Sequence, residues 1–282
     1  MTARVPRALR AAAAAGALIT MGLAGAACGA STASAPATAP AATASTPAAP
    51  ASATAPPSVP ARPAHPVTAY VASHSGTVTP IDTATSTALK PIKVAFSADA
   101  IAITPNGKTA YVANEAASNM AAGYTVIPIR TATNKAGKPI TVAAGPAAIA
   151  ITPDGTTAYV VNAASVTPIM TATSTAGKKI KIGPGPAAAV AITPDGATAY
   201  IADPGTGTVI PIRTSTSTAG TPIRFGKPAR SALEGDQIAI TPDGTTVYVI
   251  SQAGVVPIRT ATNTALTPIK VGGLPIAIAI TP

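Results

Sequence analysis

Short runs of alternating apolar and polar residues, separated by turns, recur in a fixed order along most of the chain. Residues 146–152 alternate small and branched apolar side chains, which predicts a buried β-strand. The turn at 153–156 follows, where proline fixes φ and glycine supplies the positive φ that a tight hairpin requires. Three further strands are predicted over 158–162, 166–171 and 179–182. Each repeat is therefore expected to consist of four short antiparallel strands.

The first strand, the turn and the second strand are repeated almost letter for letter. The copies read IAITPNGKTAY at 101–111, IAITPDGTTAY at 149–159, VAITPDGATAY at 190–200 and IAITPDGTTVY at 238–248. A fifth copy, IAIAITP, begins at Ile276. The repeated tyrosines fall at positions 70, 111, 159, 200 and 248, so their spacing alternates between 41 and 48 residues. A period of this length made of strands predicts a solenoid or propeller, and four strands per unit favour propeller blades.

The fourth strand of each repeat is predicted to lie at the outer rim of its blade. Its apolar positions alternate with basic or polar ones, as in Ile180-Lys181-Ile182. Lysine on an outer strand hinders edge-to-edge pairing, and we interpret most of the positive charge in this way. Proline recurs inside the third strand, at positions 80, 128, 168, 211 and 257. Because proline cannot donate to a β-ladder, the pairing of the third and fourth strands is expected to be short or bulged.

From residue 67 onward, the sequence contains five strands of each type. It starts with a second strand at 68–73 and finishes with a first strand at 276–281. We expect these two to complete one blade together and close an all-β propeller of about five blades, which would remove the open sheet edges. A truncated seven-bladed protein, or a partial ring completed by another chain, remains an alternative.

The repeated core T-P-[DN]-G-x-x-[AV]-Y-V-x-N resembles the YVTN β-propeller repeat. Tyr111–Asn114 and Tyr159–Asn162 match the pattern, whereas 200–203 and 248–251 differ at the last position. The resemblance covers residues 67–282. It implies an exported propeller, usually of seven blades and often without a known catalytic role.

The first 66 residues are predicted to serve export and attachment. Residues 1–28 combine three early arginines with an apolar run, which is typical of a secretory signal. The chain's one cysteine, Cys28, follows that run as in a bacterial lipoprotein signal, and ordinary cleavage after 24–26 is the alternative. Residues 29–66 are almost entirely Ala, Ser, Thr and Pro and are expected to form an extended stalk. We therefore expect an exported, cell-surface protein that touches the membrane only through a lipid anchor.

Two loops are longer than their counterparts in the other repeats, and both are expected on one face of the propeller. They cover 115–124 and 226–236. Insertions on one face of a repeat array often mark a binding side, although loops also lengthen neutrally. The binding residues expected on that face are His74, Asn114, Glu115, Asn119, Tyr124, Asn162, Asp203, Lys227, Arg230, Glu234 and Asp236.

Candidate catalytic chemistry is sparse. His65 falls in the stalk, so a metal site or a Ser-His-Asp triad would depend on His74 alone. The aspartates of the P-D-G turns are interpreted as turn formers, and Asp203, Glu234 and Asp236 as solvated charges in preference to calcium ligands. No cofactor, metal or catalytic residue is therefore predicted. The chain has no tryptophan, which argues against nucleic-acid binding by stacking. Without the three arginines of the signal, its 19 basic residues become 16 against 9 acidic residues, which gives a net charge of +7.

The preferred interpretation is a non-enzymatic propeller that binds a protein or a cell-wall component. A propeller hydrolase or lyase of the lactonase kind is the alternative, and it requires His74, Glu115, Glu234 or Asp236 to converge in one pocket at the channel mouth. A structural surface-layer component is a third possibility.

Overall fold

A computed structural model describes residues 67–94, 97–114, 123–227, 238–251, 254–272 and 275–281. Regular structure in these ranges consists of 23 strands arranged in five antiparallel sheets. The first two sheets contain β1 (Thr68–Ser73), β2 (Thr77–Asp82), β3 (Thr87–Ala88) and β4 (Ile92–Lys93), then β5 (Ala98–Ile103), β6 (Thr109–Asn114), β7 (Thr125–Arg130), β8 (Lys135–Ala136) and β9 (Ile140–Thr141).

The remaining three sheets follow the same plan. They contain β10 (Ala148–Ile151), β11 (Thr157–Asn162), β12 (Ser165–Met170), β13 (Thr175–Ala176) and β14 (Ile180–Lys181), then β15 (Ala189–Ile192), β16 (Thr198–Asp203), β17 (Thr208–Arg213), β18 (Thr218–Ala219) and β19 (Ile223–Arg224), and finally β20 (Ile238–Ile240), β21 (Thr246–Ser251), β22 (Gly254–Arg259) and β23 (Thr264–Ala265). The predicted all-β class is confirmed. Within the described ranges, no helix is long and apolar enough to span a membrane.

The fourth strand predicted at 179–182 is present as the short β14, and an additional short strand, β13, precedes it. In the third sheet, β13 pairs with Ile169 and Met170 of β12, whereas β14 pairs with Ser165 and Val166. Pro168 lies between the two paired stretches of β12. No ladder hydrogen bond is required from this position, so the missing N–H of proline is tolerated there. Its carbonyl still accepts a hydrogen bond from the Gly177 N–H at 2.8 Å. The predicted short or bulged pairing of the third and fourth strands is therefore confirmed. Strands such as β13 were not predicted.

The P-D-G turns between the first two strands are stabilised by their own side chains. In the third sheet, the Thr152 hydroxyl donates to Asp154 Oδ1 at 2.5 Å and the Thr156 N–H donates to the same oxygen at 3.0 Å. These hydrogen bonds, the Thr152 bond foremost, hold the pKa of the Asp154 carboxyl below its ordinary value. Gly155 has a φ of 73°, which favours glycine. The interpretation of these aspartates as turn formers is supported.

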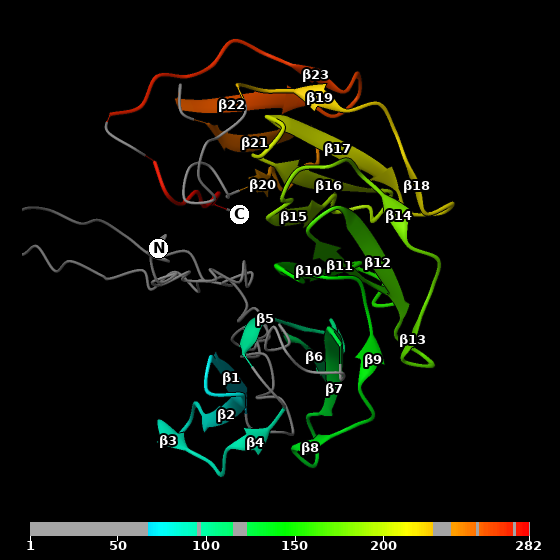
Figure 1. Ribbon diagram of the computed structural model, residues 1–282. Coiled ribbons are helices and arrows are strands. Elements are labelled where there is room, and N and C mark those ends of the chain that lie inside the picture. The colour runs from blue at the N-terminus through cyan, green and yellow to red at the C-terminus, as the bar shows by residue number, and fades with distance from the viewer. Residues whose placement is uncertain are drawn as a thin grey trace, which may run out of the picture. The chain divides into compact units, whose positions relative to one another are not determined.

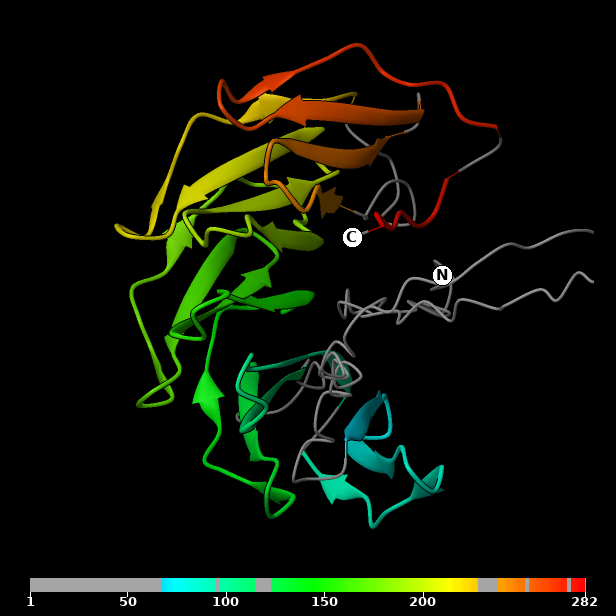
Figure 2. The ribbon, with the colours of Figure 1, turned by 180° about the vertical axis from the view of Figure 1, so that it is seen from behind.

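Consecutive sheets pack against each other in chain order (Figure 1), and the view from behind in Figure 2 shows the same succession. Their first strands β5, β10, β15 and β20 are in contact successively, and β1, the second strand of the first sheet, contacts β5. Each apolar cluster joins two neighbouring sheets: Tyr159 and Ile180 of the third pack with Ile201 and Ile212 of the fourth. Ile180 is buried while Lys181 is exposed, which confirms the predicted parity of the fourth strand.

The second-strand tyrosine of each of the first four sheets forms a hydrogen bond to the following sheet. Its hydroxyl reaches the turn between that sheet's third and fourth strands, where a non-glycine residue has a φ near 51°. The four bonds are Tyr70 to Asn134 Oδ1 (2.6 Å), Tyr111 to Thr171 O (3.1 Å), Tyr159 to Thr214 O (3.2 Å) and Tyr200 to Asn263 Oδ1 (2.8 Å). Four sheet junctions therefore have the same apolar contact and the same tyrosine hydrogen bond.

The expected closing strand is not formed. The first sheet ends at β1, with no described strand on its inner side, and residues 275–281 have no strand structure. Ile276 is 77% exposed. Every other first strand is joined to its partner by a tight hairpin, whereas 276–281 would have to pair with a strand some two hundred residues earlier. The larger loop-closure entropy of that pairing is a physical reason for the difference.

Candidate functional site

Polar side chains terminate the second strand of every sheet and lie on one face of the molecule. We call this the loop face; it comprises the loops that follow residues 73, 114, 162, 203 and 251 and the connections that lead into the next first strand. The antiparallel pairing places the P-D-G turns on the opposite side, which we call the turn face. Asn114, Asn162, Asp203 and Ser251 are all buried. The loop face thus has a buried polar residue beneath it in each of these four sheets.

Asn162 shows how such a side chain is held. Its amide Nδ2 donates to Val160 O at 3.0 Å, to Ser165 O at 3.2 Å and to Thr167 Oγ1 at 3.1 Å. Asn114 Nδ2 likewise donates to Val112 O at 3.1 Å. These bonds fix the ends of the hairpins. The Oδ1 atoms of Asn114 and Asn162 are buried and have no hydrogen-bond partner among the described residues.

Asp203 occupies the same position in the fourth sheet as a carboxyl group. Its Oδ1 accepts from the Thr206 N–H at 3.1 Å, while Oδ2 is buried with no partner in the described part of the chain. Burial raises the pKa of the Asp203 carboxyl above its ordinary value. The backbone of Gly185 lies so close that a Cβ there would collide with both carboxylate oxygens. Asp203 is therefore enclosed, and reaches a ligand only if this backbone moves.

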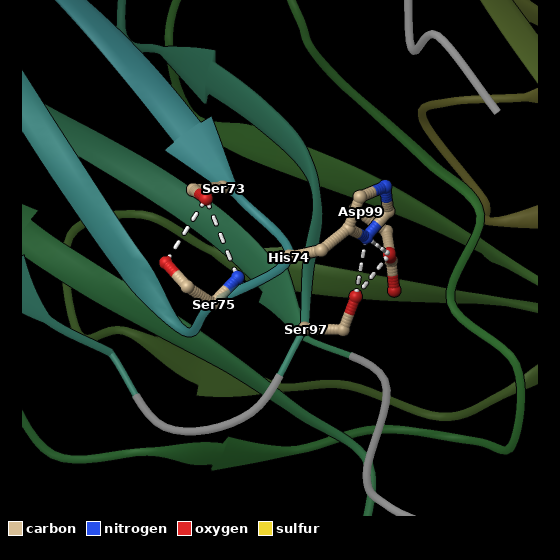
Figure 3. A network of polar contacts seen from close by, with 5 residues as sticks. All are labelled: Ser73, His74, Ser75, Ser97 and Asp99. Carbon is tan, nitrogen blue, oxygen red and sulfur yellow. Dashed lines mark hydrogen bonds and ion pairs between the residues drawn. The ribbon is translucent and has the colours of Figure 1, made fainter. Parts of the chain in front are cut away.

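His74 is an exposed polar group of this face (Figure 3). It follows β1, and its Nδ1 lies 2.7 Å from Ser97 Oγ and 3.4 Å from Asp99 Oδ1. Ser97 Oγ donates to the same Asp99 oxygen at 2.8 Å. The His74 side chain is 66% exposed and that of Asp99 18% exposed. The first sheet thus supplies the imidazole, and residues at the start of the second sheet orient it.

A β-bulge places the aspartate in this cluster. The register between β5 and β6 shifts between Ala98 and Ala100, so Asp99 is the extra residue. Bulges often redirect a side chain at functional sites. The corresponding stretch before β10 is the apolar and glycine-containing sequence at 145–147. Sequence reasoning missed Ser97 and Asp99, although this departure of 97–99 from the repeat was a signal that could have revealed them.

The hydrogen bonds determine what the imidazole can do. Because a carboxylate only accepts, the neutral ring places its proton on Nδ1, and Nε2 is left as an exposed acceptor. A Ser-His-Asp triad requires serine and aspartate on opposite ring nitrogens. Here both contact Nδ1, so Ser97 is not positioned as a nucleophile activated by Nε2. The arrangement suits an oriented hydrogen-bond acceptor or, with Asp99, a solvent-facing base.

The other predicted binding residues have different surroundings. Tyr124 is half-buried and packs against the cluster that contains Tyr111 and Val142, while Lys227 is exposed after β19. Five predicted residues lie outside the described ranges: Glu115, Asn119, Arg230, Glu234 and Asp236. Cys28 lies outside them as well.

The described residues contain no group of three or more His, Cys, Asp or Glu side chains arranged to hold a metal. A shallow hollow of about 370 Å³ lies between the outer parts of the third and fourth sheets, beside the turn face. Met170, Lys178, Lys179 and Ser217 are among its lining residues. It is thus separate from the His74 cluster and contains no carboxylate.

Comparison with known proteins supports the fold without assigning a family. No family model matches the chain, and no curated protein matches it. Among solved structures, a chain of Kuenenia stuttgartiensis hydrazine synthase is 23% identical with a TM-score of 0.59, over 70% of this chain and 61% of that one. A functionally unknown protein from Desulfotomaculum acetoxidans is 18% identical with a TM-score of 0.59, over 71% of this chain and 65% of that one. The chain thus spans less than two thirds of either, and the similarity supports a β-propeller fold of about five blades.

Proposed function

We propose that this protein is an exported, YVTN-type β-propeller that binds a protein or cell-wall component on its loop face. Residues 1–28 direct export, Cys28 carries a lipid anchor, and 29–66 form a stalk that holds the propeller away from the membrane. The repeat pattern around Tyr111 and Tyr159 supports the YVTN assignment. The role is one of binding or scaffolding.

The observation that carries this proposal is the oriented imidazole of His74. An exposed side chain normally samples several rotamers, and fixing it costs conformational entropy on binding. Contacts with Ser97 and Asp99 fix the ring before any ligand arrives. The position bridges two sheets, and it lies on the face where the insertions at 115–124 and 226–236 are expected from the sequence.

The chemistry of the site favours a partner rich in hydrogen-bond donors. In the neutral ring the exposed Nε2 accepts a hydrogen bond, and Lys227 adds a cation on the same face. Hydroxyl and amide groups of wall glycans, and backbone N–H groups of a protein loop, supply such donors. Single-stranded nucleic acid is disfavoured, because the described part of the loop face offers no aromatic platform for stacking.

A binding assay with matched variants tests the proposal. The full chain is co-sedimented with insoluble peptidoglycan from the producing cells and, separately, captured on beads bearing their detergent-extracted surface proteins. We expect one of these to bind the protein, and His74→Ala to bind about tenfold more weakly, as expected for a lost hydrogen bond and its local order. Thr173→Ala, on the turn face, is the control and should bind normally. Equal binding by wild type and His74→Ala would refute the loop-face site.

A lactone hydrolase is a second candidate, which the His74–Asp99 pair specifically favours. Nε2 could take a proton from water as the water oxygen attacks a lactone carbonyl, while Asp99 stabilises the imidazolium. The ring C–O bond of the tetrahedral intermediate then breaks, and the imidazolium returns the proton to the leaving alkoxide oxygen. A panel of five- and six-membered lactones, followed by pH-stat, tests this activity. Turnover that disappears in His74→Ala would favour the enzyme, whereas absence of turnover with every lactone would exclude it for this substrate class.

A further inference from the structure

The first sheet exposes an apolar face that is buried at every other position in the repeat. Val71 in β1 is 49% exposed, and Ala69 beside it is exposed as well. The residues equivalent to Val71 in the next four sheets are fully buried: Val112, Val160, Ile201 and Val249 are each 0% exposed. In those sheets, the preceding sheet covers this face. No described sheet covers it in the first.

The fifth sheet exposes the opposite face. Ile269 is 48% exposed and Val271 42% exposed, whereas the equivalent residues of the third sheet, Ile180 and Ile182, are each 7% exposed. In the third sheet, that pair packs against Ile201 of the following sheet. The fifth sheet therefore presents the first half of a junction, and the first sheet presents the second half.

The hydrogen-bonding groups of a junction are divided in the same way. The hydroxyls of Tyr70, Tyr111, Tyr159 and Tyr200 each donate to the following sheet, whereas that of Tyr248 makes no hydrogen bond within the described residues. The acceptor turn that would match it is in the first sheet. There Ser86 has a φ of 54°, close to the 51° of its counterparts Asn134, Ser174, Ser217 and Asn263.

The missing inner strand of the first sheet has a matching segment too. Residues 277–280 read AIAI, the same letters as β10, and have no strand structure. Ala148–Ile151 of β10 pair with Val161–Ala158 of β11. By the same register, 277–280 would pair with 72–69 on the inner edge of β1, an example of strand addition.

We propose that these two faces bind each other between copies of this chain, so that the fifth sheet of one copy packs on the first sheet of the next. A second copy is favoured over closure within one chain because the four internal junctions are close-packed, and closing the ring would alter all of them. The interface is heterologous, since each copy contributes a different face. Such contacts propagate into open arrays when the rotation does not close. Neither of the two faces includes His74 or Lys227, so this association and the proposed binding function can fail independently.

Sedimentation velocity of the full chain carrying Cys28→Ser tests this association without lipid attachment or disulfide formation. We expect species larger than the monomer whose proportion rises with protein concentration in the micromolar range. Val71→Asp blocks the first-sheet face and Ile269→Asp the fifth-sheet face, because either places a carboxylate in an apolar contact. Each variant alone should be monomeric. An equimolar mixture should form dimers and nothing larger, because only one intact pair of faces remains.

Two further variants keep this test specific. Met170→Asp changes an apolar side chain of similar exposure, 52%, outside both faces and should associate like wild type. Tyr248→Phe should weaken association by about threefold to tenfold, as expected for one hydrogen bond. A wild-type chain that stays monomeric at every concentration would overturn the proposal, and lower melting temperatures of both aspartate variants would then indicate closure within the chain. A mixture that does not dimerise would overturn it as well.

Discussion

Replacing Asp203 by asparagine should stabilise the protein at neutral pH. Asp203 places a buried carboxyl where two other sheets have the amide of Asn114 or Asn162. Asparagine keeps an oxygen to accept from the Thr206 N–H, which now bonds Asp203 Oδ1 at 3.1 Å. Its Nδ2 would replace Oδ2, which is buried and has no partner within the described ranges, and could donate to Ile201 O. Asn162 makes the equivalent bond to Val160 O at 3.0 Å.

The expected gain follows from satisfying one buried polar group. A buried, unpaired acceptor costs about 1–3 kcal/mol. Asp203→Asn should therefore raise the free energy of unfolding by at least about 1 kcal/mol at pH 7. For a folded region of this size, 1 kcal/mol corresponds to about 2–4 °C in the melting temperature. Calorimetry and urea titration of both proteins measure the two quantities.

The pH dependence separates the charge from other effects of the substitution. Burial raises the pKa of Asp203 above the ordinary value of 3.8, so the folded protein retains a proton that the unfolded chain releases. Ionisation therefore costs wild type stability as the pH rises from about 4 through the folded pKa. The advantage of asparagine should be small below that window and complete above it. The pKa is shifted in the opposite direction, downward, for Asp154, Asp195 and Asp243. These residues are present in both proteins, so their contributions cancel when the two stabilities are compared.

Two outcomes would refute this reasoning about Asp203. The first is an Asp203→Asn variant that is less stable than wild type at pH 7, because this would mean that the carboxylate has a stabilising partner such as a bound cation. An advantage independent of pH would mean that ionisation of Asp203 is not the cause.

Two further stability predictions concern the sheets and their junctions. Ile169→Asp places a charge at a fully buried position and should prevent folding, whereas Lys181→Ala on the exposed rim should change stability by less than about 0.5 kcal/mol; circular dichroism and urea titration compare them. Ile151→Asp should be milder than Ile169→Asp, since Ile151 is only half-buried. Tyr159→Phe should lower the unfolding free energy by about 1 kcal/mol, whereas Tyr248→Phe should have almost no effect on the monomer. Of these two tyrosines, only Tyr159 forms a hydrogen bond to the next sheet within the described residues. Equal losses in the last pair would contradict the junction bond.

The repeat explains why much of the fold was predictable from the sequence. Strand periodicity and the P-D-G turns act locally, so they place β10, β11 and β12 within a residue or two of prediction. The additional strand β13 was not predicted, because a two-residue pairing with the end of β12 leaves no periodic pattern in the sequence. The tyrosine bond was not predicted either, since it joins residues 55 positions apart in Tyr159 and Thr214.

The candidate site was only partly predictable for the same reason. His74 stood out as the one histidine of the repeat region, but its partners depend on a bulge that displaces Asp99 from the β5 register. Closure of the ring was expected from strand counting, which says nothing about the angle at which sheets pack. Packing of complete junctions sets that angle, and it cannot be read from one repeat.

We propose that the loop face, and not the turn face or the rim, contacts the partner. Site-specific photocrosslinking in the producing cells tests it most directly, with a photoreactive residue placed at 74, 173 or 181 in otherwise identical chains. We expect a discrete adduct of the chain only from position 74 on the loop face. Adducts from position 173 or 181 with none from 74 would contradict it.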